Sequence, residues 1–520
     1  MLNLFKTYKG DNVPKLTKYV YSFTGIGRDA AYTLINLFLM IYLQLTLPES
    51  DPQQYKLMIM TIMITMLVIH LWDAVNDPII GMLIENSRFK LGKYKPWILI
   101  GGVLNGLLLM VLFSFRPFGG WGYVIFFIVT YLLWEISFTL NDIGYWGMVP
   151  SLTRDPKQRN QITMLMAIAI NIGAFTVGGL VPSLYPGRAI QVFRTLSIII
   201  GSVLIFSQLL LVFLCKERDR SEVDSEEIIK VKDIFKVVFQ NKPLLVMLGA
   251  IVLHYLGGSM FNNLGQNYMH FTFGYAEGGQ AFFYFLVGYA VGSIAANFIF
   301  GFLVKKYTRA QILRGAFTIS AIGNSLLFVI GSTHAFGWLQ IPNSIYQWIL
   351  PVLALIIFTP NGVFYLTLLV QITNTVEYNE WKFGERKEGV VFAARPFAAK
   401  ISNAITVIVV FLTLTVGGVY DITNKISDYE VLGGLPEGDA RRLITEEVQD
   451  LAQAAIDGAN LGRARFVLIL GMALLPLICQ TLAYLLVSRK YPIDEKMYDQ
   501  MVKEIDKRRE TAAEEQVGEA

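Results

Sequence analysis

Apolar residues along this chain gather in long uninterrupted runs and do not alternate with polar ones. A helix of about 20 apolar residues is long enough to cross the hydrocarbon core of a bilayer, and twelve runs of that kind recur along the chain. The pattern predicts an all-α membrane protein with twelve transmembrane helices. These runs lie near residues 19–47, 56–85, 96–116, 121–150, 163–185, 192–215, 244–268, 279–304, 310–332, 344–376, 389–418 and 464–488.

The composition agrees with a membrane protein. Hydrophobic residues make up 54% of the 520 and charged residues only 16%, whereas about a quarter of a soluble domain is charged. The first apolar run is too long, and begins too far along the chain, for a cleaved signal peptide. We therefore expect the first helix to remain in the mature protein. The two cysteines, Cys215 and Cys479, both lie in apolar runs, which argues against a disulfide framework or a cysteine metal site.

Positive charges are concentrated in alternate loops. Lys and Arg crowd the loops that follow the even-numbered helices, whereas the short segments 48–55, 266–280 and 332–347 contain none. Cytoplasmic loops carry the excess of Lys and Arg in membrane proteins. We therefore expect a multi-pass protein of the plasma membrane with both termini in the cytoplasm.

The charged stretch 216–243 is the longest cytoplasmic interruption and divides the twelve helices into six and six. In each half, a glycine and a basic loop follow the second helix, at 81–95 and at 301–314. Two such halves around a site near the midplane are typical of major facilitator transporters. We expect an N-terminal segment 1–18, halves at 19–215 and 244–488 joined by the linker 216–243, and a cytoplasmic tail 489–520.

The eleventh and twelfth helices are joined by a long external segment, residues 419–463. Its apolar positions Leu443, Val448, Leu451 and Ala455 suggest an amphipathic surface helix. Two interpretations stay open: a solvated link between two helices, or a lid over the outer opening.

Carboxylates inside the apolar runs are the main indication of function. An Asp at the centre of a bilayer helix costs about 2.5 to 3.5 kcal/mol, so such residues mark ion or substrate paths. Asp73 and Asp77 are four residues apart and share a helix face with Asn76. Their oxygens suit a hard cation. His70, one turn earlier, is either a packing or counter-charge residue or a proton carrier.

The fourth helix carries a second polar stripe, which could face the first. Its members lie at i, i+4, i+7 and i+11 and therefore on one face: Glu135, Thr139, Asp142 and Trp146. Charges of both signs also interrupt the first helix, at Arg28 and Asp29, and the eleventh, at Arg395 and Lys400, which implies mutual compensation. For Arg28 a counter-ion role is the alternative, and for Trp146 and Tyr365 ordinary packing.

Four long motifs, WDAVNDPIIG, RFKLGKYKPWILIG, TLNDIGYWGMVPSLT and TNTVEYNEWKFGERKEG, resemble the glycoside–pentoside–hexuronide:cation symporters, the family of melibiose permease. The resemblance spans helices one to eleven. It implies a major facilitator fold and alternating-access symport of a sugar with a cation, Na⁺ being favoured over H⁺. It implies no further cofactor, no nucleic-acid partner and a functional monomer.

Site residues follow from the resemblance position by position. The implied cation ligands are Asp73, Asn76, Asp77 and Thr139, and the residue pattern adds His70 and Glu135 as possible accessory residues. The implied sugar-binding residues are Arg28, Asp29, Asp142, Trp146 and Lys400. Tyr365, which stands where melibiose permease has a tryptophan, and Arg395, which replaces a smaller polar residue, complete the expected sugar site. Ala167 stands where melibiose permease has a sugar-binding arginine, which favours another glycoside, a pentoside or a uronide.

Two other functions compete with sugar symport. A carrier of lysolipids or other amphiphiles would share the fold, but it should need an apolar lateral cleft, against which the density of charged residues argues. A non-transporting sugar sensor would usually append a sizeable signalling domain, and only about 30 residues follow residue 490. No nucleophile–base pair presents itself, so we do not expect an enzyme.

Overall fold

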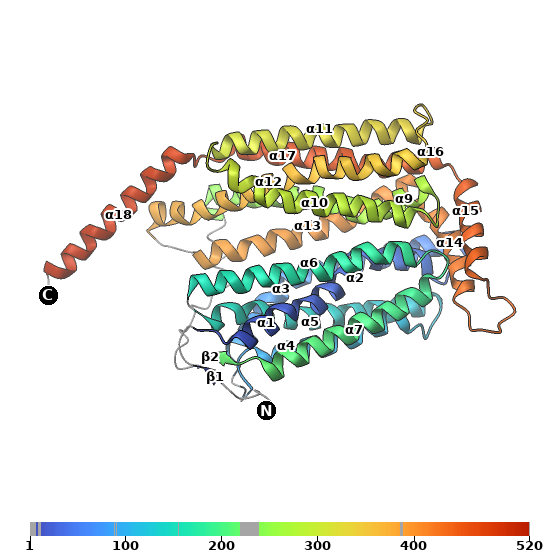
Figure 1. Ribbon diagram of the computed structural model, residues 1–520, viewed down its shortest axis with the longest axis horizontal. Coiled ribbons are helices and arrows are strands. Elements are labelled where there is room, and N and C mark those ends of the chain that lie inside the picture. Colours follow the sequence, from blue (N-terminus) through green and yellow to red (C-terminus); the bar gives the residue numbers. More distant parts are fainter. Residues whose placement is uncertain are drawn as a thin grey trace. The chain divides into compact units, whose positions relative to one another are not determined.

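The computed structural model describes residues 7–8, 12–87, 89, 91–153, 155–218, 239–384 and 388–518 (Figure 1). The first half of the chain forms β1 (Thr7–Tyr8), α1 (Lys15–Phe23), α2 (Gly25–Thr46), α3 (Pro52–Glu85), α4 (Lys95–Ser114), α5 (Gly120–Leu152), α6 (Pro156–Leu184), α7 (Ala189–Leu214) and β2 (Glu217–Arg218). The second half forms α9 (Lys242–Phe273), α10 (Gly278–Leu303), α11 (Arg309–Ala335), α12 (Asn343–Phe383), α13 (Glu388–Gly417), α14 (Val419–Gly433), α15 (Thr445–Asp457), α16 (Leu461–Ile469), the π-helix η2 (Leu470–Leu474), α17 (Leu475–Lys490) and α18 (Glu495–Gly518).

Among the described residues, twelve helical segments are long and apolar enough to cross a bilayer. This confirms the twelve predicted spans and the all-α class. The first span consists of two helices, α1 and α2, which Thr24 separates. The last, Leu461–Lys490, combines α16, η2 and α17.

Aspartate–proline pairs fix the start of two spans. The Asp51 carboxylate accepts a hydrogen bond of 3.0 Å from the Gln53 amide at the start of α3, and Asp155 accepts one of 2.9 Å from Lys157 at the start of α6. Each cap satisfies an amide that has no partner in the first helical turn, and the proline that follows needs no amide partner there.

The chain divides into two compact units. Unit 1 comprises Met1–Ile228, Gln266–Phe283 and Phe411–Ala464, and unit 2 comprises Ile229–Gly265, Tyr284–Val410 and Arg465–Ala520. In unit 1, α2 packs against α6 and α7, and α5 packs against α3 and α4. In unit 2, α11 packs against α12 and α17, and α18 packs against α12.

Close helix contact in unit 1 depends on a small residue. A Cβ atom added to Gly173 on α6 would overlap the backbone of α2 at Ile26. Small residues let helix backbones approach each other in membrane proteins. This contact lies two residues from Arg28, so it fixes α2 close to the point where that side chain projects.

The short strands β1 and β2 pair in parallel, with Thr7 opposite Glu217 and Tyr8 opposite Arg218. The Glu217 carboxylate also accepts hydrogen bonds from the backbone amides of Lys93, at 3.1 Å, and Lys95, at 3.3 Å. The start of the chain, the loop before α4 and the end of α7 are therefore tied together.

The segment between the last two spans is more helical than expected. Residues 419–433 form α14, which the sequence pattern did not predict, and the amphipathic helix α15 covers residues 445–457. The buried face of α15 carries Val448, Ala452 and Ile456, whereas Leu451 is exposed. The predicted apolar stripe was therefore partly wrong: of its residues Val448 is buried and Leu451 is not, because the buried side chains of α15 follow one another at intervals of four residues.

Candidate functional site

The polar stripes of α3 and α5 meet around three ionisable side chains. A His70 nitrogen and carboxylate oxygens of Asp73 and Glu135 all lie within 4.8 Å of one another. Asp73 and Glu135 are each only 6% exposed. The hydroxyl of Tyr131, one turn before Glu135 on α5, donates a hydrogen bond to the Glu135 carboxylate. Two acids and an imidazole this close can bind a cation or share a proton.

The remaining predicted cation ligands continue both stripes by one turn. Asn76 on α3 and Thr139 on α5 are buried, and Asp77 is half-buried. Carboxylate, amide and hydroxyl oxygens are ligands for hard cations, whereas an imidazole nitrogen suits a proton or a softer metal ion. The paired helices thus offer oxygen atoms over two turns, with one nitrogen, that of His70, at one end.

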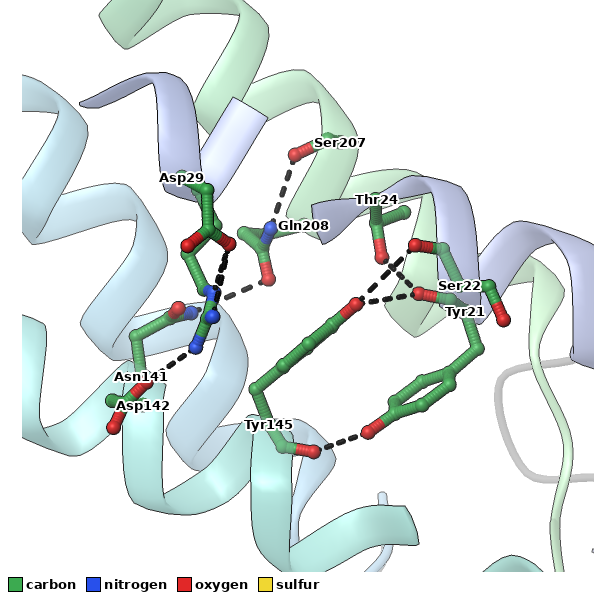
Figure 2. A network of polar contacts seen from close by, with 10 residues as sticks. Tyr21, Ser22, Thr24, Asp29, Asn141, Asp142, Tyr145, Ser207 and Gln208 are labelled. Atoms are coloured by element: carbon green, nitrogen blue, oxygen red, sulfur yellow. Dashed lines mark hydrogen bonds and ion pairs between the residues drawn. The ribbon is translucent and has the colours of Figure 1, made fainter. Parts of the chain in front are cut away.

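A buried arginine connects two other predicted site residues. The Arg28 guanidinium on α2 donates to Asp29 from Nη2 at 2.9 Å and from Nε at 3.1 Å, and its Nη1 forms an ion pair with Asp142 on α5. Figure 2 shows Asp29 and Asp142 on facing helices, with the dashed contacts converging between them. Arg28 is buried, whereas 37% of the Asp142 side chain is exposed. One cation and two carboxylates leave a single negative charge here.

Aromatic rings complete the surroundings of Arg28. The guanidinium carbon lies 4.6 Å from the centre of the Tyr145 ring and 5.4 Å from that of Trp146. Such cation–π contacts stabilise a desolvated cation. Trp146 remains 40% exposed, so part of its indole is free for contact with a ligand.

Hydrogen bonds between helices hold this cluster in place (Figure 2). The Tyr145 hydroxyl donates to the Tyr21 carbonyl at 2.9 Å, and the Tyr21 hydroxyl donates in return to the Tyr145 carbonyl. The amide of Asn141, next to Asp142, donates to the Ile98 carbonyl of α4 at 2.9 Å. These bonds fix the rotation of α5 and hence the direction of Asp142.

Unit 2 carries the remaining predicted sugar-binding residues. The hydroxyls of Tyr365 on α12 and Tyr255 on α9 lie 2.5 Å apart, and Arg395 on α13 hydrogen-bonds to both. The His254 ring stacks on Tyr365 at a centroid distance of 5.1 Å. Lys400, half-buried, lies five residues further along α13. Of the predicted sugar-binding residues, Arg28, Asp29, Asp142 and Trp146 are brought together in unit 1, and Tyr365 and Arg395 in unit 2.

Three tyrosines of these groups escaped the sequence analysis. Tyr131 lies one turn before Glu135 on the predicted stripe, and Tyr145 directly precedes Trp146, so both had a positional indication. Tyr255 had none, because a tyrosine in an apolar helix is ordinary. Only the packing of α9 against α12 reveals its hydroxyl beside Tyr365.

Residues 20–495 match the family model described as MFS/sugar transport protein. The lactose permease of Lactobacillus delbrueckii subsp. bulgaricus is 26% identical over 406 residues, which cover 75% of this chain and 61% of that protein. The raffinose carrier protein of Pediococcus pentosaceus is 25% identical, over 75% of this chain and 60% of that protein. This chain therefore spans less than two thirds of the length of these carriers. The inner membrane symporter YicJ of Escherichia coli K12 is 27% identical, over 69% and 75% of the two chains.

Two solved structures have a similar fold. A bacterial homologue of the human lysosomal transporter Spinster, in an inward-facing and unoccupied conformation, gives a TM-score of 0.54 at 11% identity, over 90% of this chain and 96% of that one. The D-xylose–proton symporter gives a TM-score of 0.54 at 13% identity, over 82% and 99%. At such low identity the likeness concerns the fold alone.

Proposed function

We propose that this chain, which belongs to the MFS/sugar transport family, is a secondary transporter that moves a sugar together with a cation by alternating access. The family match confirms the predicted resemblance, and the solved structures confirm the predicted major facilitator fold. The names of the relatives support a glycoside as the transported class. The observation that carries the proposal is the set of carboxylates on α2, α3 and α5, of which Asp73 and Glu135 are buried, because a lipid environment penalises such groups unless they bind a ligand.

The distribution of Lys and Arg supports the orientation. Both termini lie in the cytoplasm, and the α6–α7 turn, the α9–α10 turn and the α14–α15 segment lie outside. The protein acts as a monomer in the plasma membrane.

The coupling ion is Na⁺, held by Asp73, Asn76, Asp77 and Thr139. Sodium needs several oxygen ligands at once, whereas a proton needs only one titrating carboxylate and neither an amide nor a hydroxyl can carry it at physiological pH. Burial of Asn76 and Thr139 beside the acids supports a multi-oxygen site. His70 beside Asp73 and Glu135 favours H⁺ as the second candidate.

Asp29 and Asp142 accept hydrogen bonds from sugar hydroxyls, while the ion pairs with Arg28 orient both carboxylates. Bonds to a charged acceptor are about twice as strong as neutral ones. The exposed part of Trp146 covers an apolar face of the sugar ring. The other proposed sugar-binding residues, Tyr365, Arg395 and Lys400, belong to unit 2. Thr139 and Asp142 project from neighbouring turns of α5, so each ligand strengthens the binding of the other.

The test is uptake into energised vesicles at fixed pH and membrane potential, with sodium varied from trace to saturating concentration and a panel of glycosides, pentosides and hexuronides. We expect sodium to drive accumulation of at least one of them and Asp77→Asn to abolish it, since the amide keeps the volume and loses the charge. Sugar binding by the purified variant controls for folding. Accumulation driven by a pH gradient alone would show that the coupling ion is a proton and not sodium. Full concentrative uptake by Asp77→Asn would refute the cation site.

A further inference from the structure

The external ends of α6 and α10 lie in direct backbone contact within unit 1. A Cβ atom added to Gly279, in the first turn of α10, would overlap the carbonyl oxygen of Pro182 in the last turn of α6. Near this contact, the side chain of Gln266 on α9 donates a hydrogen bond of 3.1 Å to the carbonyl of Leu37 on α2. The α9–α10 turn, which belongs to the second six-helix half, is thus closed against helices of the first half.

A chain of hydrogen bonds runs through this contact. His270 Nδ1 lies 2.8 Å from the Tyr275 carbonyl, which can only accept a bond, so Nδ1 carries the proton. His270 Nε2 then accepts from the Tyr185 hydroxyl, at 2.5 Å. Tyr185 follows α6, and His270 lies near the end of α9. The imidazole therefore joins the two turns through both of its nitrogens.

Tyr275, in the α9–α10 turn, also contacts the external segment. Its hydroxyl donates to the Glu430 carboxylate of α14 at 2.6 Å, and its backbone amide donates to Gln453 Oε1 of α15 at 2.9 Å. The tyrosine is fully buried. A residue of the α9–α10 turn is therefore inserted between α14 and α15.

Glu430 fixes the external segment to the α6–α7 turn as well. Its carboxylate, fully buried, accepts hydrogen bonds from the backbone amides of Gly187, at 2.6 Å, and Ala189, at 2.8 Å. Ala189 begins α7, where a carboxylate is favoured by the partial positive charge of a helix N-terminus. The Gln191 side chain adds a bond of 2.6 Å to the Gly433 carbonyl at the end of α14.

We propose that Tyr275 is the moving part of an external gate and that Glu430 and Gln453 form its receptacle. The role of this gate rests on the transport function proposed above. Alternating access requires the two six-helix halves to separate on the outside, and separation would withdraw Tyr275 from between α14 and α15. Glu430 keeps its two backbone donors when Tyr275 leaves, so the receptacle persists for the next closure. The segment 419–463 is then more than a link: it is the part of the second half that stays bound to the first.

The experiment measures opening without measuring sugar transport. A cysteine in place of Gly179 on α6 would place its Cβ atom 3.0 Å from the Phe283 ring of α10, in the closed contact. In a Cys215→Ala and Cys479→Ala background, a membrane-impermeant maleimide added outside labels this cysteine only when the contact opens. Tyr275→Phe removes the bond to a charged carboxylate and keeps the ring, so we expect labelling about tenfold faster.

The matched control is Tyr429→Phe, one residue before Glu430, whose hydroxyl makes no hydrogen bond within the described part of the chain. It should label at the parent rate. Glu430→Gln should also label faster, because its amide group places a donor against the donors of Gly187, Ala189 and Tyr275.

Equal labelling of Tyr275→Phe and its parent, with both proteins eluting as monodisperse species, would overturn the gate. Equal acceleration by Tyr429→Phe would overturn it too, since any loss of a nearby hydroxyl would then suffice. Faster labelling of Tyr275→Phe in a protein that moves no sugar would leave the gate standing and reject the proposed function.

Discussion

Arg28 on α2 and Asp142 on α5 form an ion pair between residues that lie 114 positions apart in the sequence. The same guanidinium holds Asp29, the next residue along α2. One buried cation therefore pairs with two carboxylates from different helices. Removal of any one of the three side chains would therefore leave another without an ion-pair partner or change the charge of the cluster.

Replacement of the buried cation should destabilise the fold. Arg28→Gln leaves two carboxylates without their counter-charge, which lowers the free energy of unfolding. The loss should be smaller than about 3 to 5 kcal/mol, the cost when a fully buried pair loses one partner, because 37% of the Asp142 side chain is exposed to solvent. Thermal unfolding of the purified protein in detergent should show a lower midpoint. The exposed Arg441, paired with Asp439 at 3.0 Å, supplies the control, and Arg441→Gln should leave the midpoint unchanged. An unchanged midpoint for Arg28→Gln would mean that the triad contributes nothing to stability.

Sugar binding should depend on the charge of Asp142. Asp142→Asn keeps the size of the side chain and replaces a charged acceptor by a neutral one, so sugar affinity should fall about tenfold or more. Calorimetric titration of the purified variant measures this. Asp439→Asn is the matched control. Unchanged affinity in Asp142→Asn would remove this residue from the sugar site.

The cluster of unit 2 predicts how sugars are distinguished. If the cargo carries a carboxylate, Arg395→Gln should weaken a uronide far more than its neutral analogue, because the guanidinium pairs with carboxylates. Tyr255→Phe, which removes one hydroxyl from the same cluster, should affect both ligands alike. Competition binding with the two ligands on each variant measures the ratio. Equal loss of both ligands in Arg395→Gln would indicate a neutral cargo.

The buried carboxyl of Glu430 on α14 should make the stability of the protein depend on pH. Burial raises the pKa of this carboxyl to about 7, against hydrogen bonds from Tyr275, Ala189 and Gly187 that lower it. An unfolded glutamate has a pKa of about 4.3, so the folded state holds the proton more tightly. Its contribution to stability is complete below pH about 4.3 and is lost as the pH rises through 7.

The thermal unfolding midpoint of the parent protein should therefore decrease as the pH is raised from 5 to 8, when it is compared with the midpoint of Glu430→Gln at each pH. The groups that face Glu430 are the Tyr275 and Tyr185 hydroxyls, with His270 beyond them. They are the same in both proteins, so the difference isolates the carboxyl. A difference between the two midpoints that does not change with pH would contradict the assignment.

The sequence predicted what depends on hydrophobicity and on charges within apolar runs. Twelve spans follow from run length, and Arg28, Asp29 and Asp142 were singled out because charges are rare inside membrane helices. Uncharged residues whose role depends on a distant partner were not found. Tyr255 acquires its role from Tyr365.

The external segment shows the same limit. Residues 419–433 mix polar and apolar side chains without a clear helical stripe, so α14 was missed. Glu430 looks like a solvated acid in the sequence and is buried only because the turns at Gly187 and Tyr275 cover it. Long-range contacts of this kind are set by the packing of helices, which no local pattern encodes.

The pairing of β1 with β2 has a consequence for biosynthesis. Thr7 pairs with Glu217, so the first strand has no partner until the ribosome has completed the sixth span and released the residues after it. The N-terminal strand must therefore stay unpaired with β2 while six helices enter the bilayer, and it binds only once that half is present. Pairing of β1 with β2 thus marks the completion of the first half before the second is made.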